Sequence, residues 1–344
     1  MSVAATTGHL RAVLAHLPPV QFAMAYGSGV FRQAGYDAAD KPQLDLVLGV
    51  EDARGWHADN LQRNRQHYSL LGALGAGAVA AVQERGGARL YYHPFVDMAG
   101  EKVKYGVISL RDLAADLRDW PTLYVSGRMH KPTAVLETTP ALVALQAANL
   151  EAALRAALLL LPPAFEPRDL FDAVAALSYS GDLRFAVGAE SPSKVGDIVS
   201  ANEEGFAELY AGAVRGCRWL EGGGGGAADV RGDVLRQTLA PGSTAELVGA
   251  LPAALRGALQ PPPGQPPWGE RPDEREALAG RVRAQLGAIV RWSSATQSAK
   301  GLLTAGTRST DYLAAKLSKA AKGKSRLLAE ERRRGGNAGN GPAR

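Results

Sequence analysis

The fold of this 344-residue chain is decided by two apolar stretches that flank a glycine-rich turn: Val20-Gln-Phe-Ala-Met-Ala-Tyr-Gly-Ser-Gly-Val-Phe31 and Gln43-Leu-Asp-Leu-Val-Leu-Gly-Val50. Both are short, apolar and bounded by glycine or polar residues, which predicts two β-strands. The turn holds a hydroxyl side chain, Ser28, between two glycines, and the second strand brings in the carboxylate of Asp45. A strand, a Gly-Ser turn and an acidic strand are therefore the starting point of the fold.

Further elements follow from the hydrophobic pattern. Residues 89–96 and 102–110 predict a β-hairpin, so the sheet has at least four strands. Helical periodicity covers 110–120 and 141–161, and two prolines end the second helix. Helices dominate from there on. The predicted fold class is α+β, with a sheet and helices followed by a mainly helical part.

Shifts in composition divide the chain into segments. We expect a catalytic domain at 1–133, a mainly helical domain at 134–215, a region with Gly- and Pro-rich linkers at 216–299, a basic amphipathic segment at 300–334 and a disordered tail at 335–344. The first segment opens with a short amphipathic helix at 3–17. Its composition leaves an integral helix and a targeting presequence open, and favours the former because a long basic, Ser-rich stretch is missing.

Composition excludes several classes of protein. With 46% hydrophobic residues, the chain is not expected to be disordered. Its apolar runs fall well short of the ~20 residues that span a bilayer, so no transmembrane helix is expected. The single cysteine, Cys217, permits neither an intramolecular disulfide nor a Cys-based zinc site.

The net charge of +5 is concentrated at one end of the chain. Residues 300–334 hold ten basic and three acidic residues, a local charge of +7, so the remaining residues carry about −2. A nearly neutral body with a basic end indicates a folded unit with an electrostatic tail, and not a nucleic-acid-binding surface.

The glycine-rich turn has the chemistry of a phosphate site. The N–H groups of Gly27 and Gly29 can approach phosphate oxygens closely, and Ser28 adds a hydroxyl donor. Asp45 on the next strand can hold Mg²⁺ against the same phosphates. A Gly-Ser-Gly turn alone is more often an ordinary turn, so this interpretation depends on Asp45.

The second metal ligand is not evident. A carboxylate two residues after Asp45 would face the same way, but that position is Val47. Glu51 shares the parity of Asp45 but lies about 20 Å away along a straight strand. A chain reversal after Gly49 or another strand must supply the ligand, and Asp97 near the hairpin is a weak candidate.

Several blocks stand in a fixed order along residues 20–320. They are Tyr26-Gly-Ser-Gly-Val-Phe31, Leu44-Asp-Leu-Val-Leu-Gly-Val50, Trp56-His57 with Asn60, Asn64 and His67-Tyr68-Ser69, Lys104-Tyr-Gly-Val-Ile-Ser109, Leu123-Tyr-Val-Ser-Gly-Arg-Met-His-Lys-Pro132, Leu177-Ser-Tyr-Ser-Gly-Asp182 and Ser294-Ala-Thr-Gln-Ser-Ala-Lys-Gly301. Together they closely resemble the mitochondrial translocator assembly and maintenance proteins, which are mitochondrial phosphatidate cytidylyltransferases of the nucleotidyltransferase superfamily.

The resemblance implies both a fold and an activity. The fold would be a nucleotidyltransferase-type mixed sheet, a winged-helix-like helical domain and a basic C-terminal helix. The enzyme would use Mg²⁺ and convert CTP and phosphatidate to CDP-diacylglycerol and pyrophosphate, for cardiolipin and phosphatidylglycerol synthesis. It would be a peripheral protein on the matrix side of the mitochondrial inner membrane. A homo-oligomer is permitted by the sequence.

The resemblance also implies site residues. Asp45 would bind the metal, and Ser28 and Lys104 would act with it in catalysis. Lys104, Arg128 and Lys131 would bind the nucleotide phosphates together with Gly27, Ser28 and Gly29, although solvated surface charges are the alternative for these three cations.

Other residues fit a structural role better. His57 and His67 could bind a metal, but structural or substrate hydrogen bonding is favoured because no cysteine or close histidine pair accompanies them. Residues 178–182 are predicted to form a plain turn. The tryptophans Trp120, Trp219 and Trp292 are predicted to lie in the core.

The basic segment fits an enzyme whose substrate is a lipid. Leucines and alanines at 309–329 share one face, flanked by Lys316, Lys319, Lys322, Lys324 and Arg326. Such a helix can bind an anionic membrane surface, and a solvated basic helix is the alternative.

Two other functions stay open: a nucleotidyltransferase acting on RNA or a small metabolite, and a non-catalytic assembly factor for protein translocation. The nearly neutral body disfavours the first. The intact turn and Asp45 disfavour the second.

Overall fold

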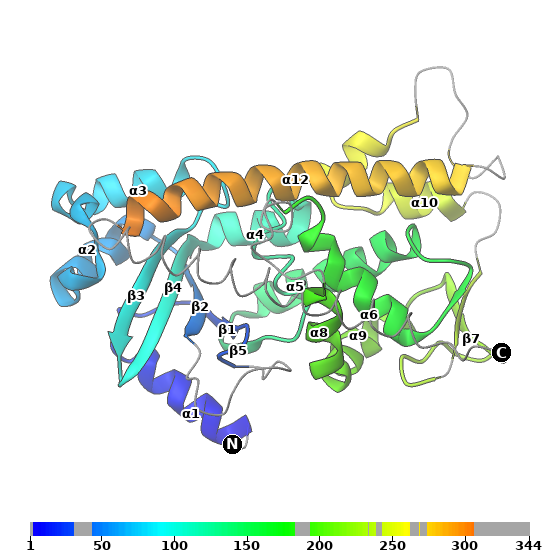
Figure 1. The fold of residues 1–344 in the computed structure, drawn as a ribbon, viewed down its shortest axis with the longest axis horizontal. Helices are drawn as coiled ribbons and strands as arrows, with labels where there is room; N and C mark the ends of the chain where they lie inside the picture. The colour runs from blue at the N-terminus through cyan, green and yellow to red at the C-terminus, as the bar shows by residue number, and fades with distance from the viewer. Residues whose placement is uncertain are drawn as a thin grey trace, which may run out of the picture.

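The computed structural model describes residues 3–30, 43–182, 193–232, 234–238, 243–261, 268 and 274–305. Within these residues the chain is an α+β protein with a five-stranded and a three-stranded sheet. Figure 1 shows the larger sheet in one half and a set of helices in the other. The long helix α12 (Glu274–Ala305) runs along both halves.

The five-stranded sheet has the order β3-β4-β2-β1-β5. Its strands are β1 (Phe22–Tyr26), β2 (Leu44–Val50), β3 (Tyr91–Met98), β4 (Glu101–Ser109) and β5 (Ala134–Glu137). Only the β2–β4 pair is parallel, so the sheet is mixed. The predicted strands and hairpin are confirmed. The expected boundary at 133 lies just before β5, which extends this sheet by pairing with β1.

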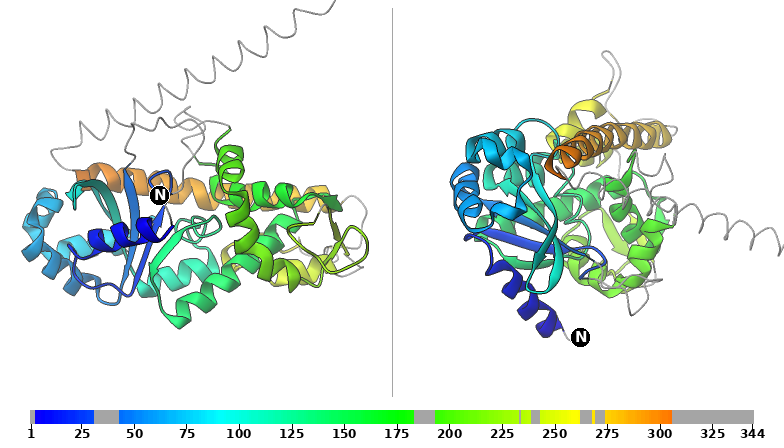
Figure 2. Two further views of the ribbon diagram at one scale, coloured as in Figure 1. Left: turned by 90° about the horizontal axis from the view of Figure 1, so that it is seen from below. Right: turned by 60° about the vertical axis from the view of Figure 1, so that its left-hand side comes forward.

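Both faces of this sheet are covered. On one face, Leu46 and Leu48 pack against Leu10 and Val13 of α1 (Val3–Leu14) and against α2 (Ala53–Arg63). The opposite face packs against α4 (Leu110–Asp119). Because both faces are buried, β2 is apolar at nearly every position. Figure 2 shows α1 crossing the sheet, and its buried residues make it an integral helix of the fold.

A polar network ties α2 to the covered face. His57 contacts the Tyr68 hydroxyl at 2.8 Å and the Gln83 side chain of α3 (Ala76–Glu84) at 2.9 Å. Asn60 donates to the hydroxyls of Tyr68 and Tyr105. The short 3₁₀ helices η1 (Arg65–His67) and η2 (Leu70–Leu74) join α2 to α3. Both ring nitrogens of His57 are engaged inside the protein, as the structural interpretation predicted.

A second core fills the helical half. Its helices are α5 (Pro140–Leu158), α6 (Pro167–Ala176), η3 (Leu177–Tyr179), α8 (Lys194–Ala201), α9 (Glu203–Arg215), α10 (Ser243–Gly249), α11 (Ala253–Arg256), η4 (Gly257–Leu259) and the first part of α12. A small sheet of β6 (Ala164–Phe165), β8 (Leu235–Gln237) and β7 (Leu220–Gly222) completes it.

One helix of this half, α5, is long and apolar enough to cross a membrane by length and composition. About half of it is buried inside the protein, where the side chain of Asn149 accepts a hydrogen bond from Trp120. These contacts are those of a core helix.

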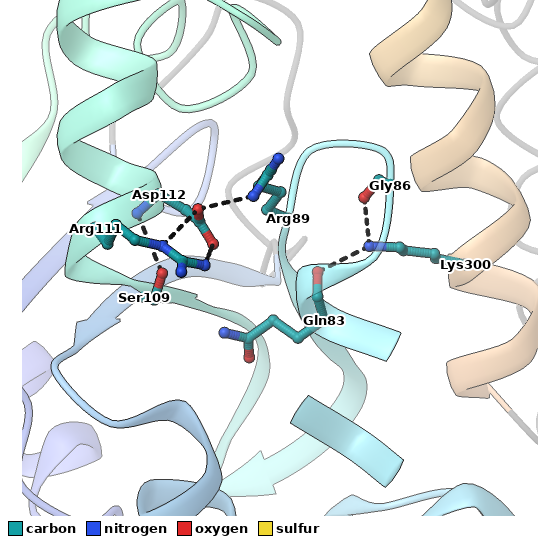
Figure 3. Close-up of polar contacts among 7 residues, drawn as sticks. All are labelled: Gln83, Gly86, Arg89, Ser109, Arg111, Asp112 and Lys300. Carbon is teal, nitrogen blue, oxygen red and sulfur yellow. Dashed lines mark hydrogen bonds and ion pairs between the residues drawn. The ribbon is translucent and has the colours of Figure 1, made fainter. Parts of the chain in front are cut away.

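The C-terminal part of α12 docks on the sheet half through a buried lysine. Lys300 donates to the backbone oxygens of Gln83 at 3.0 Å, in the last turn of α3, and of Gly86 at 2.8 Å, just after the helix (Figure 3). Nearby, Arg89 pairs with the buried Asp112 of α4. Lys300 is therefore a structural residue and not part of a basic surface, although the sequence placed it at the start of the basic segment. The expected boundary between 299 and 300 lies inside this helix.

Two other sequence expectations have different outcomes. Trp120 and Trp219 lie in the core as predicted, but Trp292 is 65% exposed on α12, so its core assignment is wrong. The residues around Trp292 are mostly small, so the hydrophobic pattern did not indicate which side of the helix is buried. The five basic residues at 316–326 and the tail at 335–344 lie outside the described residues.

The buried histidines predict that stability depends on pH. Burial lowers the pKa of His57 to about 4, although its hydrogen bond to Gln83 opposes this. The unfolded chain therefore binds more protons between pH 6.5 and 4, and the free energy of unfolding falls as the pH drops through that window. We expect a loss of about 2 kcal/mol at pH 5 from His57 alone, measured by urea unfolding at pH 7.5 and 5.

Substitution separates this effect from general acid sensitivity. His57→Gln should show a weaker pH dependence than the wild type, whereas His16→Gln, at an exposed position, should keep it. An equal pH dependence in His57→Gln and the wild type would contradict the assignment.

Candidate functional site

The turn after β1 requires glycine at two positions. Gly27 has a positive φ of 79°, which non-glycine residues rarely adopt. A Cβ on Gly29 would lie 2.6 Å from the backbone oxygen of Gln43, just before β2. The N–H of Val30 closes the turn by donating to the Gly27 oxygen. The loop therefore passes so close to β2 that a side chain on Gly29 would push it out of place.

Asp45 lies directly beside this turn. It stands opposite Tyr26 of β1 and opposite Lys104 of β4, so the three side chains form a row across adjacent strands. One carboxylate oxygen accepts a hydrogen bond from Lys104 Nζ at 3.0 Å, and the other lies 3.7 Å from where a Gly27 Cβ would be. Both side chains keep over a quarter of their surface exposed, so solvent and ligands can reach them.

The charge of Lys104 is stabilised by its partner. Burial by itself lowers the Lys104 pKa, but the adjacent Asp45 carboxylate together with Tyr26 and Tyr124 more than offsets this, and the pKa is raised above its ordinary value. The ammonium also lies 4.6 Å from the centre of the Tyr92 ring, and the Tyr92 hydroxyl is 3.2 Å from that of Tyr26. Lys104 is thus a permanently charged group at the rim of the sheet.

The Lys104-Tyr-Gly106 block has a role at each position. Lys104 faces Asp45, whereas Tyr105 points to the opposite face and joins the polar network of α2. Gly106 stands opposite Tyr92, and a Cβ there would lie 2.6 Å from the Tyr92 ring. The glycine therefore leaves room for the ring under Lys104.

A second loop, residues 122–131, is held by one buried carboxylate. Asp116 of α4 is 3% exposed and accepts five hydrogen bonds of 2.6–3.2 Å. The donors are the N–H and hydroxyl of Thr122, the N–H of Val125, and the N–H and hydroxyl of Ser126. Asp116 thereby fixes the start of a helical turn that carries two cations. The sequence analysis missed it, and its only signal was a carboxylate beside the leucines of the predicted helix, on the side where Asp112 is also buried.

Arg128 reaches from this turn toward the glycine-rich loop. Its guanidinium lies 5.2 Å from the centre of the Tyr26 ring and 3.8 Å from that of Tyr124. It also donates to the Tyr124 backbone oxygen. Since Tyr26 immediately precedes Gly27, Arg128 is brought next to the turn by its stacking on this ring.

Lys131 points the other way, toward the helical half. It donates to the backbone oxygen of Gly127 and, at 2.8 Å, to the hydroxyl of Ser178 in η3. The ammonium lies 5.0 Å from the centre of the Tyr179 ring. Burial, reinforced by Arg128, lowers the Lys131 pKa to about 7. The block at 178–182 is thus more than a plain turn, because it contacts a cation of the site.

Comparison with known proteins identifies the family. The family model described as mitochondrial phosphatidate cytidylyltransferase matches residues 10–319. A protein of that name from Rattus norvegicus is 39% identical over 332 residues, covering 91% of this chain and 95% of the relative. The chain belongs to this family. The namesakes from Xenopus laevis and Caenorhabditis elegans are 38% and 34% identical, each over 90% of this chain and more than nine-tenths of their own length.

Within this cytidylyltransferase family, the structure brings most of the expected site residues together. Gly27, Ser28 and Gly29 form the turn, and Asp45 and Lys104 form an ion pair beside it. Arg128 joins them through Tyr26. Lys131 lies on the same short turn as Arg128 but contacts a different part of the protein. Besides Asp116, sequence reasoning missed the tyrosines that seat the cations, because aromatic residues in strands are ordinarily core.

The described residues hold no cluster of three or more potential metal ligands. Glu51 and Asp52 follow the far end of β2, where Asp52 caps α2. Asp97 is highly exposed on the β3–β4 hairpin and pairs with Lys102. Among the residues that the structure describes, Asp45 is therefore the carboxylate placed beside the turn. A single carboxylate fits a Mg²⁺ ion whose other ligands are nucleotide phosphates and water, since Mg²⁺ commonly takes one or two protein carboxylates.

The close approach at Gly29 makes a stability prediction. Gly29→Ala should lower the free energy of unfolding by about 1–3 kcal/mol, because the new methyl group collides with the Gln43 carbonyl. Chemical denaturation measures the change. The matched control is Gly8→Ala in α1, where a Cβ meets nothing within 4 Å. Equal stability of the two variants would show that the loop does not approach β2 as described.

Proposed function

We propose that the protein is a phosphatidate cytidylyltransferase, which joins CTP and phosphatidate into CDP-diacylglycerol and releases pyrophosphate. The observation that carries this proposal is the Asp45–Lys104 pair beside the Gly27–Gly29 turn, in a chain that matches the family over most of its length. The product is a precursor for cardiolipin and phosphatidylglycerol synthesis.

The finer fold assignment is part of the proposal. A mixed sheet with a Gly-Ser turn and an acidic second strand supports a nucleotidyltransferase-type domain. The small sheet, whose Phe165, Leu220 and Leu235 share one core with α5, α6 and α9, supports a winged-helix-like second domain. The relatives' names supply a mitochondrial location, and we place the protein on the matrix side of the inner membrane as a peripheral protein.

The reaction needs charge neutralisation more than proton transfer. A phosphate oxygen of phosphatidate forms a bond to the α-phosphorus of CTP, and the bond from that phosphorus to the β-phosphate oxygen breaks. The phosphatidate phosphate is mostly dianionic near neutral pH, since its second pKa is about 6–7 by analogy with other phosphomonoesters, so no general base is required. The site must bring two anions together in line and stabilise the charge on the leaving pyrophosphate.

The residues at the turn have the properties that this chemistry needs. The N–H groups of the turn and the Ser28 hydroxyl would hold phosphate oxygens, and Lys104 and Arg128 would offset their charge. Asp45 would hold Mg²⁺, which supplies further charge neutralisation at the phosphates when bound. Because Lys104 is already fixed by Asp45 and Tyr92, it needs little reorganisation when the nucleotide arrives.

The rival functions lack comparable support. A polynucleotide substrate needs a basic body, and the chain outside residues 300–334 is close to neutral. A non-catalytic assembly factor has no use for a half-buried Asp45–Lys104 pair, reachable from solvent, beside a turn that tolerates only glycine at two positions. A homo-oligomer is compatible with the proposed function, which does not depend on the oligomeric state.

Substitution of Asp45 tests the proposal. Asp45→Asn should reduce turnover of CTP and phosphatidate at least 10³-fold, because it removes the carboxylate charge at nearly constant shape. Formation of labelled CDP-diacylglycerol is the measurement. Asp97→Asn is the control, since it removes an exposed carboxylate on the hairpin and should leave turnover within twofold. Wild-type turnover in Asp45→Asn would refute the role of Asp45, and an inactive wild type would refute the proposed function.

The basic C-terminal segment is proposed to bind an anionic membrane. Because Lys300 and Thr304 are buried in the fold, the segment available for this role begins after α12. Attraction of about 1 kcal/mol per basic residue near the surface predicts binding to vesicles that contain acidic lipid, weakened by salt.

Truncation after Ala305 should therefore reduce turnover on phosphatidate in bilayers more than on a short-chain, water-soluble phosphatidate, measured with the same labelled CTP. Equal losses on both substrates would assign the segment to the folded site. Equal retention on both would make it a solvated helix.

A further inference from the structure

The site contains three cations that are neutralised to different degrees. Lys104 pairs with the Asp45 carboxylate at 3.0 Å. Arg128 is stacked on Tyr26 and Tyr124. For Lys131, the described residues supply two oxygen acceptors and a ring but no carboxylate, and the charged group that acts on it is the like-charged Arg128. Lys131 is thus a half-buried cation that an incoming anion would stabilise.

The contacts of Lys131 leave donors free for that anion. An ammonium group has three N–H donors, and the Gly127 oxygen and Ser178 hydroxyl take two of them. Because the Ser178 oxygen accepts from Lys131, its own O–H is available to donate. One lysine N–H and one serine O–H, 2.8 Å apart at their heavy atoms, therefore have no acceptor among the described residues at the junction of the sheet half and the helical half.

The junction itself is tightly built. A Cβ on Gly127 would collide with the Ser178 side chain and with the Leu123 oxygen. The backbone at Gly127 therefore packs directly against the Ser178 side chain. Behind η3, Gly181 has a φ of 72°, and a Cβ there would lie 2.6 Å from the Gly287 oxygen of α12. The geometry of Lys131 and Ser178 is therefore held from both sides, as a binding site requires.

The direction of Lys131 separates it from the nucleotide groups. Arg128 contacts Tyr26, next to the glycine-rich turn, whereas Lys131 turns to η3 from the same helical turn. Two phosphate groups must meet in the proposed reaction, and the cations on this turn reach to two different places. On the basis of the proposed function, we propose that Lys131 and Ser178 bind the phosphate of the acceptor lipid, phosphatidate, and that the nucleotide phosphates are held by the glycine-rich turn, Lys104 and Arg128.

This assignment moves Lys131 from the nucleotide to the acceptor. It places the attacking phosphate on the side of the helical half, with Arg128 between the two anions. The repulsion between Arg128 and Lys131 is costly without ligand and is outweighed by their attraction to the phosphates when both substrates are bound. The pair thus favours the state in which both substrates are bound.

Separate measurements for the two substrates test the assignment. Lys131→Met should raise the KM for short-chain, water-soluble phosphatidate by about 10–100-fold, the cost of a charge-assisted hydrogen bond, and leave the Kd of CTP with Mg²⁺ within twofold by titration calorimetry. Ser178→Ala should raise the same KM by a smaller factor. Lys102→Met, which removes an exposed lysine of equal charge, should change neither quantity. Arg128→Met should instead weaken CTP binding.

The pH dependence gives a readout that a structural role would not move. The groups facing Lys131 are Arg128 and His130 from its own turn and Tyr179 from η3. With a pKa of about 7, Lys131 loses its charge above neutrality, whereas an arginine at this position stays charged. The ratio of the wild-type KM for phosphatidate to that of Lys131→Arg should therefore rise roughly tenfold between pH 7 and 8.5. This ratio cancels the ionisation of the substrate itself.

The outcomes are distinguishable. If Lys131→Met weakened CTP binding as much as it raised the KM for phosphatidate, Lys131 would belong to the nucleotide site and the inference would be wrong. Unchanged KM values in folded Lys131→Met and Ser178→Ala would also overturn it. If Lys131→Met does not fold, Ser178→Ala and the pH profile of Lys131→Arg decide. A wild type that neither binds CTP nor turns over phosphatidate would refute the proposed function instead.

Discussion

The buried carboxylate of Asp116 is the interaction on which the arrangement of the site depends. A carboxylate inside a protein is tolerated only when its oxygens are satisfied, and here five donors from residues 122–126 converge on it. Those donors are the start of the turn that carries Arg128 and Lys131. Because the carboxylate belongs to α4, which packs directly on the sheet, the turn is fixed relative to Asp45 and Lys104 as well. One side chain thereby sets the positions of two cations that it does not touch.

The charges of the site form a graded series. Lys104 has a carboxylate partner, Arg128 has aromatic rings, and within the described part of the chain Lys131 contacts neutral oxygens and a ring. Each cation is held by packing before any ligand arrives, so binding anions requires little rearrangement of the protein. The same packing keeps the uncompensated charges apart, on different sides of one helical turn. A reaction between two anions needs such a surface, because the two substrates repel each other and fixed cations offset that repulsion without the reorientation that water dipoles would need.

The two halves of the protein are joined by contacts that leave little room for sliding. Helix α12 crosses both halves, with Lys300 capping the end of α3 and Gly287 packed on Gly181 near the site. The two hydrogen bonds of Lys300 and the close approach of Gly181 to Gly287 both form only when α12 lies at one position along its axis. The helical half is thereby held where η3 can contact Lys131. The long helix contributes to the site by fixing the distance between its two sides.

The sequence by itself determined the strands, their hairpin, the helical second half and the residues of the glycine-rich turn, because these depend on local periodicity and on backbone conformations that only glycine adopts readily. It also predicted that Asp45 and Lys104 lie at the site, through the blocks that resemble the family. The direction of Lys131, the role of Asp116, the burial of Lys300 and the exposure of Trp292 were decided only by the tertiary structure. Each of these depends on what lies opposite a side chain in space, and the partners come from segments up to 217 residues apart, as for Lys300 and Gln83. A linear pattern records which side chains are polar, but not which buried group satisfies them.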